Sequence, residues 1–140
     1  MKRIGILHPG EMGTSVAVSA INNGHQVFWA SQGRSDKTRV RAEKHGLIEI
    51  DSVYHLCQVC EVILSICPPH AAEDVAQSVV KTGFRGLFLD ANAISPRRSI
   101  KIGQFMENAG IRFVDGSIIG GSAWTPKSTW LYLSGDDSEE

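Results

Sequence analysis

The sequence lacks three features that would each point to a class of protein: a long apolar run, an excess of one charge, and paired cysteines. No apolar run approaches the roughly 20 residues that span a bilayer. The apolar stretch Ile4–Leu7 is too short for the core of a signal peptide. Fourteen basic and 15 acidic side chains give a net charge of −1, which excludes the broad positive field of a nucleic-acid binder. Three cysteines, an odd number, form no disulfide framework. We expect a cytoplasmic globular domain with neither a nucleic-acid nor a membrane partner.

What the 140 residues do contain is a regular alternation of apolar, β-branched segments with segments of helical period. Several apolar segments are nearly continuous, as in strands that are covered on both faces. The alternation predicts an α/β fold of the Rossmann type, a doubly wound and mostly parallel sheet with helices on both faces. One domain, residues 1–135, is followed by an acidic tail, residues 136–140. The predicted strands are 3–7, 26–29, 61–66, 86–90, 112–115 and 129–134, the direction of the last being open.

Particular residues mark the expected helix ends and buried helix faces. Asp51, Pro69 and Ser95 stand at predicted helix starts. Residues 117–128 have no regular period and are predicted to be irregular. A glycine follows four of the predicted helices, where the cap needs a left-handed backbone: Gly24, Gly46, Gly83 and Gly110. Helical spacing predicts three buried faces: Met12, Val16 and Ala20; Ala72, Val75, Ala76 and Val79; Phe105, Met106 and Ala109.

The turn between the first strand and the first helix has the composition of a phosphate-binding loop. In the dinucleotide fingerprint, glycines form the tight turn, admit the pyrophosphate and let helix and strand pack closely. Gly10 and Gly13 match the second and third glycines, and His8 replaces the first. Helix-start amides together with the helix dipole favour an anion there. The segment His8, Pro9, Gly10, Glu11, Met12 and Gly13 is therefore a candidate cofactor site.

Two questions about this turn stay open. The glycines would also suit a strand–helix turn that binds no ligand. His8 would either donate a hydrogen bond to a phosphate or pack at the end of the strand. Glu11 would repel phosphate, so its side chain is expected to point outward.

The end of the second strand predicts which nucleotide is preferred. An acidic residue there accepts from the ribose 2′-hydroxyl of NAD, whereas an arginine accommodates the 2′-phosphate of NADP. No acid occurs between Gln26 and Ser35, while Arg34 offers guanidinium donors and Ser31 and Ser35 offer hydroxyls. We therefore expect NADP (NADPH) as cofactor in preference to NAD. The alternative is a solvated loop that happens to contain an arginine.

With these residues located, the chain resembles the β-hydroxyacid dehydrogenases, which include 3-hydroxyisobutyrate and 6-phosphogluconate dehydrogenases. It is most similar to a bacterial branch of phosphogluconate-dehydrogenase-like NAD-binding proteins. The resemblance runs along essentially the whole chain and rests on four motifs in the family's order. They are the turn His8–Gly13, the strand-end pair Cys67-Pro68 before Pro69, the segment Asp90–Pro96, and the segment Asp115–Gly121.

The resemblance implies roles for particular residues. Cys67, Pro68 and Pro69 would line the cofactor, and Asn92 would lie near the nicotinamide end. Ile119, Gly120 and Gly121 would face the substrate, with Ile119 in place of a substrate-binding serine of the family. The implied reaction is hydride transfer between NADP(H) and a small hydroxyacid or keto acid, and reduction of an imine is also open.

The family places its catalytic lysine on a later helix, ahead of an all-helical domain, and no lysine here matches that position. We therefore expect these residues to be the cofactor-binding half of a longer oxidoreductase, inactive alone, whose full-length form is a possible homodimer. A stand-alone NADP-binding or sensing module without catalysis is the alternative. A transferase or epimerase on the same fold is a third.

Two other clusters are interpreted as structural. His55, Cys57 and Cys60 lack the second pair of ligands that a zinc site needs, so no metal is expected. The two cysteines are predicted to be core-facing. Arg97, Arg98 and Lys101 form a small basic cluster that we interpret as solvated surface.

Overall fold

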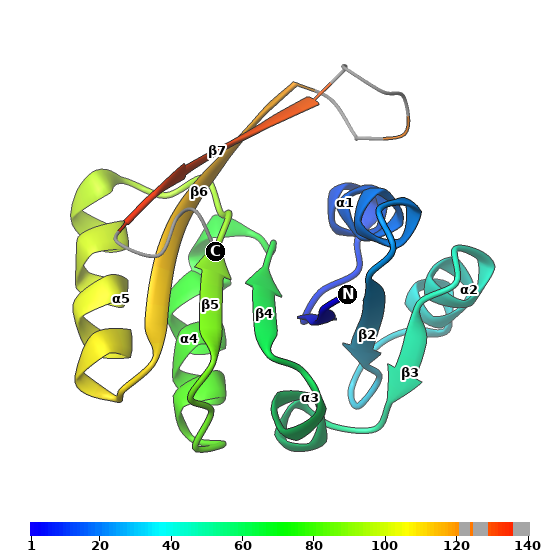
Figure 1. Ribbon diagram of the computed structural model, residues 1–140, viewed down its shortest axis with the longest axis horizontal. Coiled ribbons are helices and arrows are strands. Elements are labelled where there is room, and N and C mark those ends of the chain that lie inside the picture. Colours follow the sequence, from blue (N-terminus) through cyan, green and yellow to red (C-terminus); the bar gives the residue numbers. More distant parts are fainter. Residues whose placement is uncertain (121–123, 125–128, 136–140) are drawn as a thin grey trace.

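The computed structural model describes residues 1–120, 124 and 129–135. Seven strands form one sheet in the order β3-β2-β1-β4-β5-β6-β7 (Figure 1). All neighbouring strands are parallel except the antiparallel pair β6 and β7. The strands are β1 Arg3–Ile6, β2 Gln26–Ala30, β3 Ile48–Ile50, β4 Val62–Ser65, β5 Leu87–Asp90, β6 Arg112–Gly120 and β7 Thr129–Ser134.

Helices cover both faces of the sheet (Figure 1), which confirms the predicted Rossmann-type fold. On one face pack α1 and α2, and on the other α3, α4 and α5. A strand order that reverses beside β1 opens a crevice at the carboxyl ends of the strands, where such folds bind ligands. The helices are α1 Glu11–Asn22, α2 Asp36–Lys44, α3 Val53–Val59, the 3₁₀ turn η1 Pro69–Ala71, α4 Ala72–Val80 and α5 Pro96–Asn108.

Alternate residues of the central strands enter separate cores. Ile63 of β4 packs with α3, α4 and α5, whereas its neighbour Leu64 packs with α1 and α2. Phe88 and Trp29 are the largest fully buried side chains of the two cores. Burial on both faces explains why these strands are nearly continuous apolar runs in the sequence.

Two strands differ from the prediction. β3, Ile48–Ile50, was not predicted as a strand, because a three-residue segment with a central glutamate carries little apolar signal. β6 continues to Gly120, so residues 117–120 are strand and not irregular as predicted. That extension pairs antiparallel with the next strand, β7, from Ser117 with Tyr132 to Gly120 with Thr129. The sequence of residues 117–120 alone carries no period that predicts it.

The buried helix faces and helix caps agree only in part with those predicted from the sequence. The predicted face of α4 is fully buried. In α1, however, the buried residues include Gly13, Thr14 and Ala17, because the small residues let the helix approach the sheet, and the predicted Met12, Val16 and Ala20 are half-buried. In α5, Phe105 is exposed, contrary to the prediction, and Ile102 and Gly103 are buried instead.

The predicted cap Asp51 is also wrong, since the Ser52 hydroxyl accepts from the amide of His55. Ser95 does cap α5, accepting from the amide of Arg98. All four predicted helix-ending glycines have φ values between +78° and +88°. Among the described residues, no helix combines the length and apolar character that crossing a bilayer requires.

Candidate dinucleotide-binding site

The amino end of α1 is open to a ligand. Gly10 is its N-cap and supplies no side-chain acceptor, whereas serines cap α2, α3 and α5. A Cβ placed on Gly10 would meet no atom within 4 Å, so space is available beside the first-turn amides. Glu11 is exposed, as expected. Amide donors, a helix dipole and open space together fit a pyrophosphate.

The turn that precedes α1 is fixed by its own hydrogen bonds. The Gly10 amide donates to the His8 carbonyl at 2.8 Å, and the Thr14 hydroxyl donates to the Pro9 carbonyl at 3.0 Å. Arg41 of α2 also donates to the Pro9 carbonyl, at 3.2 Å. Sequence reasoning missed Arg41, because 32 residues separate it from Pro9 and no local pattern links the two.

His8 and Arg34, which the sequence suggested separately, lie in direct contact. Arg34 Nη1 lies 2.8 Å from His8 Nδ1. Burial, and secondarily the charge of Arg34, lower the pKa of His8 to about 4. The imidazole is therefore neutral at physiological pH and accepts a hydrogen bond from the guanidinium. The loop after β2 is thus joined to the turn that precedes α1.

The two serines proposed with Arg34 have other partners. The Ser31 side chain is buried and its hydroxyl donates to the Ile50 carbonyl at 3.4 Å. Ser35 caps α2, its hydroxyl accepting from the Thr38 amide at 3.2 Å. Arg34 is exposed and presents a guanidinium at this edge of the sheet. Of the three, Arg34 is the residue best placed to bind an anion.

One cavity, of about 320 Å³, lies beside the turn and contains both His8 and Arg34. Its walls come from the ends of β1 and β2 and from α3 and α4, so it lies at the carboxyl edge of the parallel sheet. We call it the ribose cavity, because Arg34, the residue expected to meet the adenosine ribose, lines it. Its lining residues are Leu7, His8, Ala30, Gln32, Arg34, Val53, Ala71, Asp74, Val75 and Ser78.

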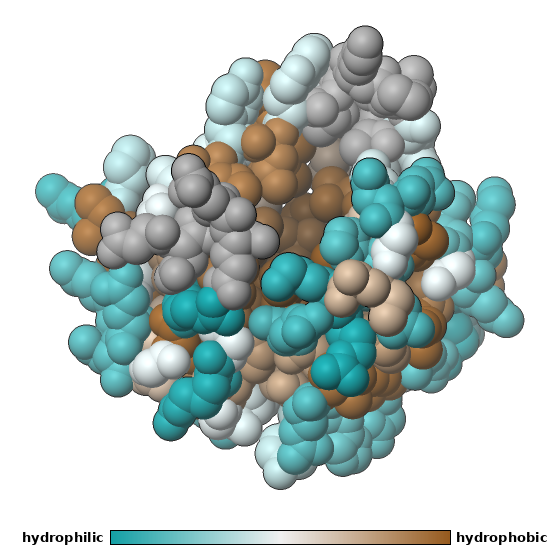
Figure 2. Space-filling model, in the orientation of Figure 1, coloured by the Kyte–Doolittle hydropathy of each residue, from teal (hydrophilic) through white to brown (hydrophobic). Residues whose placement is uncertain are grey.

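A second cavity, of about 410 Å³, is lined by Met12 of α1 and by residues at and after the ends of β4 and β5. We call it the nicotinamide cavity, because Asn92, which the family resemblance places near the nicotinamide end, lines it. Figure 2 shows an apolar hollow in this region, between the β6–β7 hairpin and α1. None of the described residues that line it is charged. They are Met12, Ile66, Cys67, Pro69, Ala91, Asn92, Ala93, Ile94, Ser117, Ile118 and Ile119.

Most residues suggested by the family resemblance are brought to this second cavity. Cys67, Pro69, Asn92 and Ile119 line it. Pro68 is the N-cap of η1, and Gly120 is the last residue of β6. Gly121 lies outside the described residues.

Both the oxygen and the nitrogen of the Asn92 side-chain amide form hydrogen bonds. Its Oδ1 accepts from the Cys67 amide at 2.6 Å, and its Nδ2 donates to the Ser65 hydroxyl at 3.0 Å. The Asn92 backbone amide donates to Asp90 Oδ1 at 2.9 Å. The network fixes the loop after β4 against the loop after β5, and both loops line the nicotinamide cavity.

Asp90 is the buried acid of this network. Burial is the main reason why its pKa is raised to about 6, and the charge of Asp115 adds to the effect. Its Oδ2 has no hydrogen-bond partner within the described part of the chain. Local sequence gave no sign of this, because the burial of Asp90 depends on the elements that pack around the end of β5.

The basic cluster on α5 was predicted to be solvated surface, and Arg98 departs from that prediction. Arg98 binds both carboxylate oxygens of Glu73 on α4, at 2.7 and 2.6 Å, and donates to the Pro69 carbonyl at 2.5 Å. The hydrogen bond from Arg98 lowers the pKa of Glu73 to about 2. Arg98 thereby ties α5 to the η1 segment beside the nicotinamide cavity.

Cys57 of α3 and Cys60, its C-cap residue, face the core, as predicted. Cys57 and Cys60 are buried. Burial raises the pKa of both thiols, that of Cys60 to about 12, so neither is a thiolate at neutral pH. No group of three or more metal-ligating side chains occurs in the described ranges.

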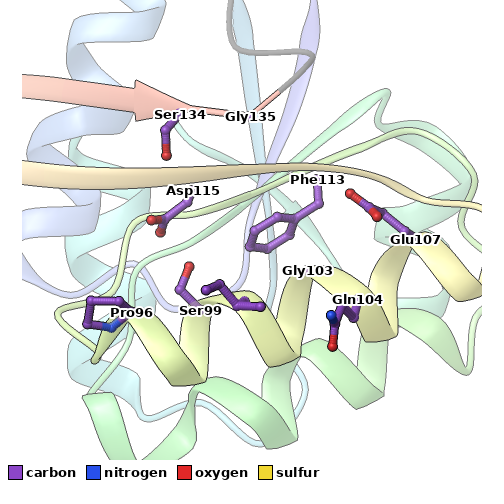
Figure 3. Close-up of a pocket in the computed structure, with 10 residues that line it drawn as sticks. Pro96, Ser99, Gly103, Gln104, Glu107, Phe113, Asp115, Ser134 and Gly135 are labelled. Carbon is purple, nitrogen blue, oxygen red and sulfur yellow. The ribbon is translucent and has the colours of Figure 1, made fainter.

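A further hollow, of about 380 Å³, lies away from the turn between α5 and the strands β6 and β7 (Figure 3). Its lining includes the carboxylates of Glu107 and Asp115. In Figure 3 the Phe113 ring lies against α5 at Gly103, where an added Cβ would be 3.0 Å from the ring. Two carboxylates in the lining disfavour an anionic ligand in this hollow.

A doubly wound sheet with a glycine turn and cavities at the carboxyl ends of its strands defines a nucleotide-binding α/β domain. The family assignment is more particular. A family model described as the NAD binding domain of 6-phosphogluconate dehydrogenase matches residues 3–139, and the chain belongs to this family.

Among curated relatives, an uncharacterized 28.5 kDa protein of Methanothermus fervidus is 30% identical over 118 residues, which cover 84% of this chain and 45% of that protein. Among solved structures, a conserved protein of unknown function, described as structurally similar to 3-hydroxyacid dehydrogenases, is 29% identical with a TM-score of 0.84. The match covers 98% of this chain and 51% of that one. The chain thus spans about half the length of these relatives.

More distant structures share the fold. Mycobacterium tuberculosis 3-hydroxyisobutyrate dehydrogenase, solved with L-serine, is 21% identical with a TM-score of 0.85, covering 99% of this chain and 48% of that one. A variant imine reductase of Myxococcus stipitatus in complex with NAD⁺ is 18% identical with a TM-score of 0.81. The match covers 97% of this chain and 47% of that one. Imine reductase from the same organism was also solved with NADP⁺, at 15% identity and a TM-score of 0.75. That match covers 86% of this chain and 42% of the other.

Proposed function

We propose that this domain binds NADP(H) in preference to NAD(H) and forms the cofactor-binding part of an oxidoreductase. The proposed reaction transfers hydride between the nicotinamide and a small hydroxyacid or keto acid, or to an imine. The observation that carries the nucleotide preference is the position of Arg34, which lines the ribose cavity in contact with His8. No acidic residue at the end of β2 competes with it.

The chain's own residues support each part of the bound dinucleotide. The first-turn amides of α1 donate to the pyrophosphate, and Arg34 donates to the 2′-phosphate. Asp74, which lines the same cavity from α4, opposes the phosphate charge, so the preference is a balance between these two side chains. The apolar nicotinamide cavity would shield the nicotinamide ring of the cofactor from water. The bound cofactor would supply the hydride.

Reduction of a C=O or C=N bond also needs a proton donor within hydrogen-bond reach. No carboxyl, histidine or lysine is among the described residues that line the nicotinamide cavity. We therefore propose that the proton comes from a group other than these residues.

Arg34→Ala is expected to weaken NADPH binding about 10- to 100-fold and to leave NADH binding nearly unchanged. A charge-assisted hydrogen bond to a phosphate contributes roughly 1.5–3 kcal/mol, and NADH has no phosphate at this position. Calorimetric titration of the wild type and the variant with each nucleotide measures the effect. Arg97→Ala is the matched control, because Arg97 is exposed on α5 and lines neither cavity. Equal affinity of the wild type for NADPH and NADH would overturn the proposed preference.

A further inference from the structure

His8 occupies the position of the first fingerprint glycine, and its side chain has a defined partner. The half-buried imidazole reaches from the turn after β1 to the loop after β2, where Nδ1 meets Arg34 Nη1 at 2.8 Å. Both side chains line the ribose cavity. A glycine at position 8 would leave the guanidinium without this partner.

The chemistry of the contact fixes the role of each group. A guanidinium has only donors, so Nδ1 must be the acceptor and the imidazole proton lies on Nε2. Burial of the ring favours the neutral form that this geometry requires. Arg34 has five N–H donors, and the contact with His8 uses one of them, which leaves the others for an anion.

Arg34 is also held through its backbone. Its amide donates to the Ser31 carbonyl at 3.0 Å, closing a turn in which Gly33 has a φ of +76°. The turn fixes where the side chain begins, and His8 fixes where it ends. A long side chain that is ordered before the ligand arrives loses less conformational entropy on binding.

We propose that His8 is a positioning residue for nucleotide specificity, which holds the Arg34 guanidinium at the ribose cavity for the 2′-phosphate of NADP(H). This inference rests on the proposed preference for NADP(H). His8 acts through Arg34, so its removal should affect the nucleotide that carries the 2′-phosphate and spare the one that does not.

The experiment compares dissociation constants for NADPH and NADH, and for 2′,5′-ADP and 5′-ADP, in the wild type, His8→Gly and His8→Asn. His8→Gly is expected to weaken binding of NADPH and 2′,5′-ADP about 3- to 10-fold, the usual effect of losing one hydrogen bond. Binding of NADH and 5′-ADP is expected to change less than about twofold. His8→Asn, whose side-chain oxygen can accept from Arg34, is expected to retain the wild-type ratio.

A double variant separates positioning from general damage to the turn. If His8 acts through Arg34, His8→Gly combined with Arg34→Ala should show the same NADPH-to-NADH ratio as Arg34→Ala alone. Denaturation midpoints of each variant confirm that the domain is folded. A wild type without preference for NADPH would overturn the proposed nucleotide preference and this inference with it. A wild type that prefers NADPH, with an unchanged ratio in His8→Gly, would overturn the role of His8 alone.

Discussion

Replacing Gly13 by alanine is expected to lower the free energy of unfolding by about 1–2 kcal/mol. The new Cβ would lie 2.8 Å from the His8 carbonyl oxygen and 3.0 Å from Cδ1 of the fully buried Ile6. The carbonyl belongs to a hydrogen-bonded turn, so it cannot retreat without moving the backbone. Overpacking costs about 1–3 kcal/mol, which exceeds the gain of up to about 1 kcal/mol from better helix propensity. Urea denaturation followed by circular dichroism measures the difference.

Gly10→Ala is the matched control, because it makes the same chemical change three residues earlier. Its Cβ meets no atom within 4 Å, and a φ of −72° suits alanine. We expect a loss of stability below about 1 kcal/mol, from the poorer N-cap alone. NADPH binding should nevertheless weaken, because the methyl group occupies the space beside the first-turn amides. Equal losses of stability in the two variants would contradict the different roles of these glycines.

The sequence was sufficient for features that depend on local chemistry. Alternating apolar and helical segments predicted the parallel sheet, and glycine with a left-handed backbone marked helix ends such as Gly24 and Gly46. Gly10 and Gly13 were recognised because a strand–turn–helix phosphate loop occupies consecutive residues. Each of these signals lies within a few positions along the chain.

Features that depend on long-range contacts could not be predicted in this way. The pairing of His8 with Arg34 spans 26 residues, and that of Arg98 with Glu73 spans 25. Asp90 Oδ2 has no hydrogen-bond partner among the described residues, and this depends on which elements cover β5. Such contacts decide how the side chains of the candidate site are held, whereas the local signals indicate only where in the chain the site lies.

The stabilising effect of Asp90→Asn, relative to the wild type, is expected to be up to about 3 kcal/mol greater at pH 7.5 than at pH 4. In the folded wild type, burial raises the pKa of Asp90 to about 6 from its ordinary value of 3.8. Between these values the folded state binds a proton that the unfolded chain releases, so wild-type stability falls as pH rises from about 4 to 6. A difference of about two pKa units corresponds to about 3 kcal/mol. Urea denaturation at a series of pH values measures the effect.

Asparagine keeps the oxygen that accepts from the Asn92 amide but places an NH₂ group at the Oδ2 position, which has no partner in the described part of the chain. This cost does not depend on pH, so the change with pH isolates the buried charge. Asp115 stands opposite Asp90 in the β5–β6 register, and its charge raises the pKa of Asp90. In an Asp115→Asn background, the pH-dependent gain from Asp90→Asn should therefore shrink and shift to lower pH. A gain that is the same at pH 4 and pH 7.5 would show that Asp90 is not held as a buried acid. The loops that line the nicotinamide cavity would then be joined without the charge cost inferred from the structure.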